Sequence, residues 1–158
     1  LGLRLTKSGR EISFWGEENA KEIRCIEKND YGVQTLADLF GILLESWCKE
    51  TAYPSCQHDY VQENDPTYGQ CAITATIVYD LFGGTINRVR FSDGGTHYFN
   101  RIDGRDIDLT SDQFDLYDIE VNYEKNEKMS RKYCNKNPDT FKRYQLLMTR
   151  MSEVAQGR

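Results

Sequence analysis

Long apolar segments and a leader-like start are absent from this sequence. Its apolar runs are short, as in residues 39–44 (LFGILL), whereas a membrane helix needs ~20 apolar residues. The chain does not open on a basic region followed by an apolar stretch, which is the pattern of a secretory signal. We therefore expect no membrane association, and the odd number of cysteines predicts a free thiol in a reducing cytoplasm.

Paired cysteines, histidine clusters and nucleotide motifs are also absent. The five cysteines are an odd number without a CxxC pair, and there are two histidines. This composition argues against a disulfide framework or a structural zinc site. A metal site built from Cys56, His58, Cys71 and His97 is disfavoured, because the spacing from Cys56 to His58 is too tight for the usual zinc knuckles. Neither G-x-x-x-x-G-K-[ST] nor G-x-G-x-x-G occurs, so we expect no metal, no nucleotide and no other cofactor.

Positive charge is in deficit, but its distribution is uneven. The net charge of −5 disfavours nonspecific binding to nucleic acids. Residues 103–120 carry seven acidic side chains, whereas residues 121–150 carry eight Lys or Arg. Two interpretations stay open: both segments are ordinary solvated faces, or the basic one docks an acidic partner.

Helical periodicity marks three parts of the chain, which we expect to form one domain over residues 1–158. Apolar residues recur at helical spacing over 33–48, with Asn29 or Asp30 as the N-cap. A second helix is predicted over roughly 68–82, opened by a capping box of Thr67 and Gln70. Residues 138–153 predict a third, inside a C-terminal helical segment spanning 115–158.

Period-two patterns predict a meander of strands between the second and third helices. The expected strands are 85–91, 96–102 and 105–109, with turns at 92–95 and at Asp103-Gly104. Residues 111–137 are ambiguous, and the polar extension 1–32 has weak strand signals at 3–5 and 12–15. The order predicts an α+β fold with helices packed on a small antiparallel sheet and a core over about 33–114.

Cys71 is the first candidate for chemistry, because it lies in the first turn of the second predicted helix. The positive end of a helix lowers the pKa of a thiol and favours the nucleophilic thiolate. Cysteine is also common in cores, and Cys71 lies on the apolar stripe of this helix. Gln70 could help to hold an oxyanion, although its predicted capping role explains it more simply.

The Asp103-Gly104 turn brings two further candidates together. If these two residues form the turn, Ile102 pairs with Arg105, and paired residue numbers sum to 207. His97 and Asp108 then become diagonal neighbours on one face, within reach of a side-chain hydrogen bond. A thiol nucleophile needs such an oriented base. Asn100 is a rival orienter, but the register points it to the opposite face.

Several stretches resemble the YunG-like family of small bacterial proteins. They are residues 47–54 (WCKETAYP), 69–75 (GQCAITA), 80–84 (DLFGG), 97–101 (HYFNR) and 108–114 (DLTSDQF). A broader resemblance is to transglutaminase-like thiol enzymes, which carry a helix-initial Cys, a strand His followed by aromatic residues, and an Asp before Pro or Thr. This resemblance implies a transglutaminase- or papain-like core with Cys71, His97 and Asp108 as its catalytic residues.

Two hypotheses for function follow. The first is a cysteine-dependent acyl-transfer enzyme that performs amide hydrolysis, deamidation or transamidation on a protein or a small amide. The second is a non-catalytic module on the same fold, with Trp15 and residues 121–150 as contact surfaces. An open cleft beside Cys71 favours the enzyme, and a filled one favours the module. The sequence leaves the oligomeric state open.

Overall fold

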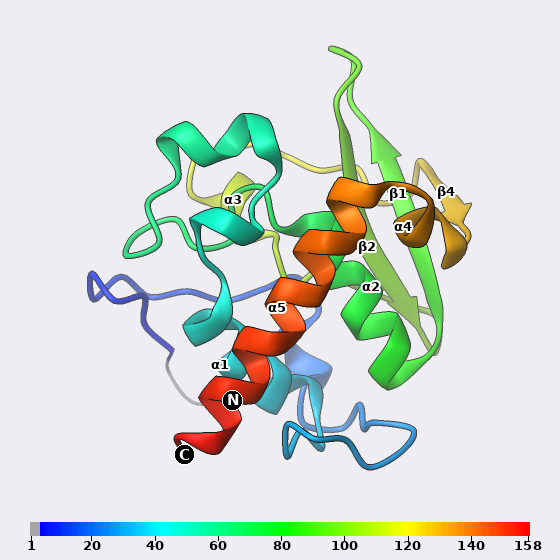
Figure 1. The fold of residues 1–158 in the computed structure, drawn as a ribbon. Helices are drawn as coiled ribbons and strands as arrows, with labels where there is room; N and C mark the ends of the chain where they lie inside the picture. The colour runs from blue at the N-terminus through cyan, green and yellow to red at the C-terminus, as the bar shows by residue number, and fades with distance from the viewer. Residues whose placement is uncertain (1–3) are drawn as a thin grey trace.

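The computed structural model describes residues 4–158 and has an α+β fold (Figure 1). Residues 4–158 form five α-helices, four strands and three short 3-10 turns. The helices are α1 (Leu36–Ser46), α2 (Cys71–Phe82), α3 (Asp112–Asp115), α4 (Lys132–Lys136) and α5 (Pro138–Gln156). The strands are β1 (Thr85–Arg90), β2 (Thr96–Ile102), β3 (Arg105–Ile107) and β4 (Asn126–Met129). The 3-10 turns are η1 (Glu17–Asn19), η2 (Lys49–Thr51) and η3 (Pro54–Asp59).

The strands form one antiparallel sheet in the order β3-β2-β1-β4. The predicted register of the β2–β3 hairpin is confirmed, because Ile102 pairs with Arg105 and Asn100 with Ile107. Asp103 and Gly104 both have positive φ, 51° and 75°, as a tight two-residue hairpin turn requires. The hairpin formed by β1 and β2 extends beyond the rest of the molecule in Figure 1.

Two features of the sheet differ from the prediction. β3 ends at Ile107 rather than at residue 109, because the amide of Asp108 donates instead to the carbonyl of Trp15 at 3.0 Å. β4 comes from the ambiguous segment 111–137 and pairs with β1. Its short polar sequence, Asn126–Met129, lacks the apolar alternation that identifies a strand.

The predicted N-cap of α1 was wrong. Helix α1 begins at Leu36, and Thr35 is its N-cap in a capping box with Asp38. Thr35 Oγ1 accepts a hydrogen bond from the amide of Asp38 at 3.3 Å, and the Asp38 carboxylate accepts from the amide of Thr35 at 3.0 Å. Asn29 instead closes a loop, since its side-chain oxygen accepts from the amide of Val33 at 3.1 Å.

The capping box predicted for the second helix was also wrong. Helix α2 begins at Cys71, and Gln70 is its N-cap without a side-chain capping bond. The Gln70 amide group turns to a neighbouring segment instead: its nitrogen donates to the carbonyl of Cys48 and its oxygen accepts from the Thr51 hydroxyl, both at 2.9 Å. The later start makes Cys71 the first residue of the helix.

Helix α2 lies between α5 and the sheet, and α1 packs against α5 (Figure 1). One buried apolar cluster joins these helices, and it also includes Ile12, Phe14 and Ile23 from the segment expected to be a polar extension. The expected strands 3–5 and 12–15 are reduced to isolated bridges, one from Leu5 to Glu11 and one from Trp15 to Asp108. Residue 3 of the first expected strand lies outside the described residues. The N-terminal segment therefore completes the core.

Helix α5 extends the predicted 138–153 by three residues and presents Tyr144, Leu147 and Met151 to the core. None of the helices formed by the described residues has the length and apolar character of a membrane span.

We expect Gly84→Ala to be among the most destabilising glycine substitutions. Gly84 joins α2 to β1 with φ of 73°, and a Cβ there would lie 2.3 Å from the carbonyl oxygen of Arg101. Strain and clash together should cost about 3 kcal/mol of unfolding free energy. Gly94→Ala is the matched control, because Gly94 has φ of 91° but no atom within 4 Å of such a Cβ, so about 1 kcal/mol is expected. Equal losses in urea unfolding would refute this explanation.

Candidate active site

Cys71 opens α2 and lines the main cleft of the molecule. The residue as a whole is half-buried, and the cleft has a volume of about 600 Å³. Its walls come from the start of α2, the β1–β2 hairpin, the segment 53–69 and the α4–α5 region. Cys71 is therefore a wall residue of the cleft, although its thiol group is itself buried.

His97 and Asp108 form the contact that the hairpin register predicts. His97 Nε2 lies 2.6 Å from Asp108 Oδ2, and each side chain is 1% exposed. The Phe114 ring packs edge-to-face with the imidazole, with ring centroids 4.6 Å apart. The other ring nitrogen, Nδ1, is buried and makes no hydrogen bond within residues 4–158. Asp108 thus fixes the orientation of the ring and leaves Nδ1 available.

Cys71 and His97 change each other's ionisation. Burial on its own raises the pKa of the Cys71 thiol, but the interaction with His97 and the backbone of Tyr98 outweigh it, so the pKa is lowered. Burial lowers the pKa of His97, whereas Asp108 and Cys71 raise it, with a net rise to about 10. The thiolate is present above the lowered pKa of Cys71, and the imidazolium below the raised pKa of His97. A thiolate–imidazolium pair is therefore favoured between the two values.

Besides His97, Tyr123 and Thr110 also hold the Asp108 carboxylate in place. The hydroxyl of Tyr123 donates to Asp108 Oδ2 at 2.7 Å, while the amide and hydroxyl of Thr110 donate to Oδ1 at 3.1 and 3.2 Å. The Tyr123 ring packs against two other rings, with centroid distances of 4.9 Å to Phe99 and 5.2 Å to Trp15. Burial and the neighbouring carboxylate raise the pKa of Tyr123, so its hydroxyl stays a hydrogen-bond donor.

Tyr123 and Trp15 are the site residues that sequence analysis missed as neighbours of the carboxylate. Tyr123 lies in the polar segment 111–137, where no periodicity indicates a buried side chain. Trp15 is 55% exposed and was predicted only as a contact surface. No spacing rule brings either residue to Asp108, because both are joined to it through irregular segments.

We expect Tyr123→Phe to destabilise the protein and to change the ionisation of His97. Asp108 Oδ2 loses a buried donor, which should cost about 1.5 kcal/mol of unfolding free energy, and the less stabilised carboxylate should raise the pKa of His97. Tyr117→Phe is the control, because exposed Tyr117 makes a comparable bond to Asp65 at 3.0 Å. Urea unfolding and the imidazole NMR shifts against pH measure both effects. An unchanged His97 titration in Tyr123→Phe would contradict this role.

The two accessory candidates are engaged elsewhere. The register predicted Asn100 on the face opposite to His97; in the structure its side-chain nitrogen donates to the carbonyl of Ala75 in α2 at 2.9 Å. Gln70 is fully buried and bonded to Cys48 and Thr51, so its side chain lies away from the cleft surface. Within residues 4–158, no group of three or more His, Cys, Asp or Glu side chains is arranged to hold a metal ion.

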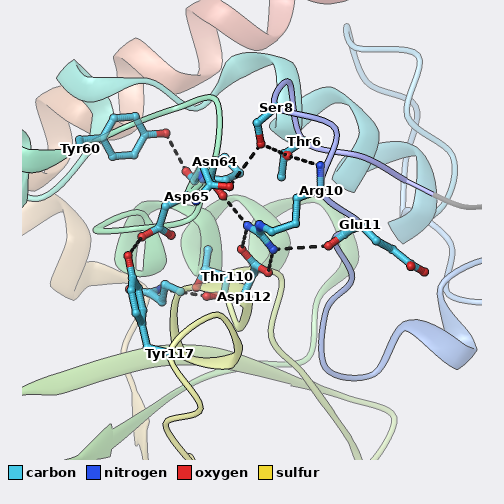
Figure 2. A network of polar contacts seen from close by, with 12 residues as sticks. Thr6, Ser8, Arg10, Glu11, Tyr60, Asn64, Asp65, Thr110, Asp112 and Tyr117 are labelled. Atoms are coloured by element: carbon cyan, nitrogen blue, oxygen red, sulfur yellow. Dashed lines mark hydrogen bonds and ion pairs between the residues drawn. The ribbon is translucent and has the colours of Figure 1, made fainter.

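A second polar network fixes the segments that flank the site (Figure 2). Arg10 donates to both carboxylate oxygens of Asp112, at 2.9 and 2.7 Å, and also to the carbonyl of Asn64. Tyr117 donates to Asp65, whose pKa is raised mainly by burial. The network ties the loop before Cys71 to α3, which follows Asp108, and so holds the two segments in place together.

Comparison with known proteins gives a family. A family model described as YunG protein matches residues 35–156, which include Cys71, His97 and Asp108. A similar protein is the one named Uncharacterized protein YunG from Bacillus subtilis (strain 168), which is 38% identical over 73 residues. That alignment covers 46% of this chain and 57% of the relative, so it spans little more than half of the relative's length. No solved structure matches the chain.

Proposed function

The chain belongs to the YunG family, and we propose that it is a cysteine-dependent acyl-transfer enzyme with a transglutaminase- or papain-like core. Its nucleophile is Cys71, its base is His97 and its orienting carboxylate is Asp108. The reaction is amide hydrolysis, deamidation or transamidation.

One arrangement carries this proposal. His97 is bonded to Asp108 at 2.6 Å through Nε2, and its charge lowers the pKa of a thiol that lines an open cleft. A structural histidine would have no need of a free ring nitrogen, and a core cysteine would have a raised pKa. The alternative of a non-catalytic module expects a filled cleft, so the cleft beside Cys71 supports the enzyme.

The proposed chemistry has two halves. The Cys71 thiolate attacks the carbonyl carbon, so a C–S bond forms and the π electrons of the carbonyl move to its oxygen. The intermediate then collapses: the C–N bond breaks, His97 gives its proton to the leaving amine, and a thioester remains on Cys71. Water or an acceptor amine next attacks the thioester while His97 takes its proton, and the thiolate leaves. Asp108 orients His97 throughout.

Backbone amides are the proposed stabilisers of the oxyanion. The first amides of a helix lack intrahelical partners, and α2 starts at Cys71 itself. The positive end of this helix favours both the thiolate and the developing oxyanion. The Gln70 side chain serves by holding the segment 48–51 against the helix start rather than by direct contact with a substrate.

An activated ester tests the proposal without a known substrate. We expect 4-nitrophenyl acetate to release a burst of about one 4-nitrophenolate per chain, with one acetyl group located on Cys71 by peptide mass spectrometry. Cys71→Ala should abolish the burst. Cys25→Ser is the matched control, because Cys25 is also half-buried but lies outside the cleft, and it should keep the burst. Acetylation spread over other nucleophiles, with Cys71 unmodified, would disprove the proposal.

A further inference from the structure

The cleft beside Cys71 is basic although the protein is acidic. The chain has 25 Asp or Glu against 20 Lys or Arg. Among the described residues that line the cleft there is no Asp or Glu, whereas Arg88 and Arg143 both line it. A concave wall of one sign focuses potential and concentrates ligands of the opposite sign. The cleft therefore differs in charge from the rest of the surface.

Arg88 is the more exposed of the two arginines. Its guanidinium lies between two rings, 6.0 Å from the centroid of Tyr98 and 5.7 Å from that of Tyr133. Its carboxylate partner Glu127 lies 2.7 Å away, and the side chain of Glu127 is 43% exposed against 11% for Arg88. Glu127 thus accepts from both Nε and Nη2 of Arg88, at 2.8 and 2.7 Å, while the guanidinium lies along the cleft wall.

Arg143 repeats this arrangement on another wall. Its guanidinium carbon lies 5.6 Å from the centroid of the Tyr53 ring, and its carboxylate partner Asp139 is 49% exposed. Arg143 Nη1 donates to the carbonyl of Thr51 at 3.1 Å, so this arginine also fixes the cleft wall. Two guanidiniums held against tyrosine rings therefore line one cavity with the thiol.

We propose that the acyl compound bound beside Cys71 carries a carboxylate or equivalent anionic group, which Arg88 binds. This inference rests on the proposed acyl-transfer function and names its substrate class. A guanidinium suits such a group, because its planar donors match the two oxygens of a carboxylate. The Tyr98 and Tyr133 rings lie against the guanidinium, and Arg143 adds positive charge on the other wall.

Two alkylating agents of similar size test the charge preference. Iodoacetate is an anion and iodoacetamide is neutral, and both alkylate thiols. The measured quantity is the rate of Cys71 alkylation by iodoacetate divided by the rate with iodoacetamide. We expect this ratio to exceed the same ratio for N-acetylcysteine amide by at least about fivefold. Arg88→Met should lower the ratio about fivefold by slowing iodoacetate alone. His97 contributes equally in both proteins, so the variant isolates Arg88.

Arg90→Met is the matched control. Arg90 lies on the same strand and bonds the same Glu127, at 2.9 Å, but its side chain is 62% exposed and does not line the cleft. Its substitution changes the net charge equally and should leave the ratio unchanged. An equal fall in both variants, or no preference in the unmodified protein, would overturn the proposal.

The alkylation ratio can be measured without enzymatic turnover, so it is independent of the acyl-transfer test. If Cys71 prefers the anion but is not acetylated, the anionic ligand class is supported and acyl transfer is rejected. If Cys71 is acetylated but shows no anion preference, acyl transfer is supported and the anionic ligand class is rejected.

Protection from iodoacetamide distinguishes two sources of the anion. Glutarate represents a free small acid, and the capped peptide acetyl-Glu-Gln-Glu-amide represents an acidic peptide, with glutaramide as the neutral control. Protection by glutarate supports a free acid, and protection by the peptide alone supports an acidic peptide. Equal protection by glutaramide and glutarate, or none by any of the three, contradicts binding of an anionic group.

Discussion

Replacing His97 with alanine is expected to lower the rate of Cys71 acetylation by 4-nitrophenyl acetate by at least about 10³-fold at neutral pH. Two losses combine. Without the neighbouring imidazolium, burial dominates and raises the pKa of the thiol above its ordinary range, so little thiolate is present. The group that carries the proton between the thiol and the leaving group is also gone.

His58→Ala is the control for this substitution, because it changes the other histidine of the chain. The His58 side chain is 78% exposed, lies 3.9 Å from Asp59 and does not line the cleft. In His58→Ala, Cys71 should be acetylated at the same rate as in the unmodified protein. Circular dichroism and urea unfolding check that His97→Ala remains folded. A folded His97→Ala protein that acetylates Cys71 at an undiminished rate would remove His97 from the mechanism.

Asp108→Asn is expected to lower the same rate by about 10²- to 10⁴-fold. An amide at this position is neutral and presents either an oxygen or an NH₂ group to His97 Nε2, so it no longer stabilises the imidazolium and no longer fixes one tautomer. The raised pKa of His97, about 10 in the unmodified protein, should fall. The upper pH limit of the thiolate–imidazolium pair should fall with it.

Asp106→Asn is the matched control for Asp108→Asn. Asp106 lies on β3 two residues away and bonds Arg101 at 2.8 Å, with its side chain 26% exposed. Its replacement should leave the acetylation rate and its upper pH limit in place. The decisive readout is the pH dependence of the rate, since a general loss of structure would lower the rate at all pH values without moving that limit.

The hairpin is the part of the site that could be predicted from sequence. A two-residue turn fixes which residues pair, so Asp103-Gly104 alone determines that His97 and Asp108 are diagonal neighbours. The structure confirms this register over residues 100–107. Helical periodicity also located α1, α2 and α5; it placed the start of α5 correctly at residue 138, but it began α1 and α2 too early. The N-cap predictions failed because several polar residues precede each helix and each offers a plausible cap.

The surroundings of the hairpin could not be predicted. Tyr123, Trp15 and Phe114 reach Asp108 and His97 through irregular or very short elements, whose course depends on tertiary packing rather than on local pattern. The same holds for the cleft, which takes its walls from segments as distant as Tyr53 and Arg143. A charge count along the chain divides it into acidic and basic segments, but it does not reveal a basic cleft in an acidic protein.

The ionisation of Cys71 tests the central claim most directly. The rate of Cys71 carbamidomethylation by iodoacetamide, followed by peptide mass spectrometry across pH, reports the fraction of thiolate in the unmodified protein and in His97→Ala. We expect the midpoint for the unmodified protein to lie below that of a free cysteine, and the midpoint for His97→Ala to lie above it. Coincident midpoints in the two proteins, or a raised midpoint in the unmodified one, would contradict the thiolate–imidazolium pair on which the proposed function depends.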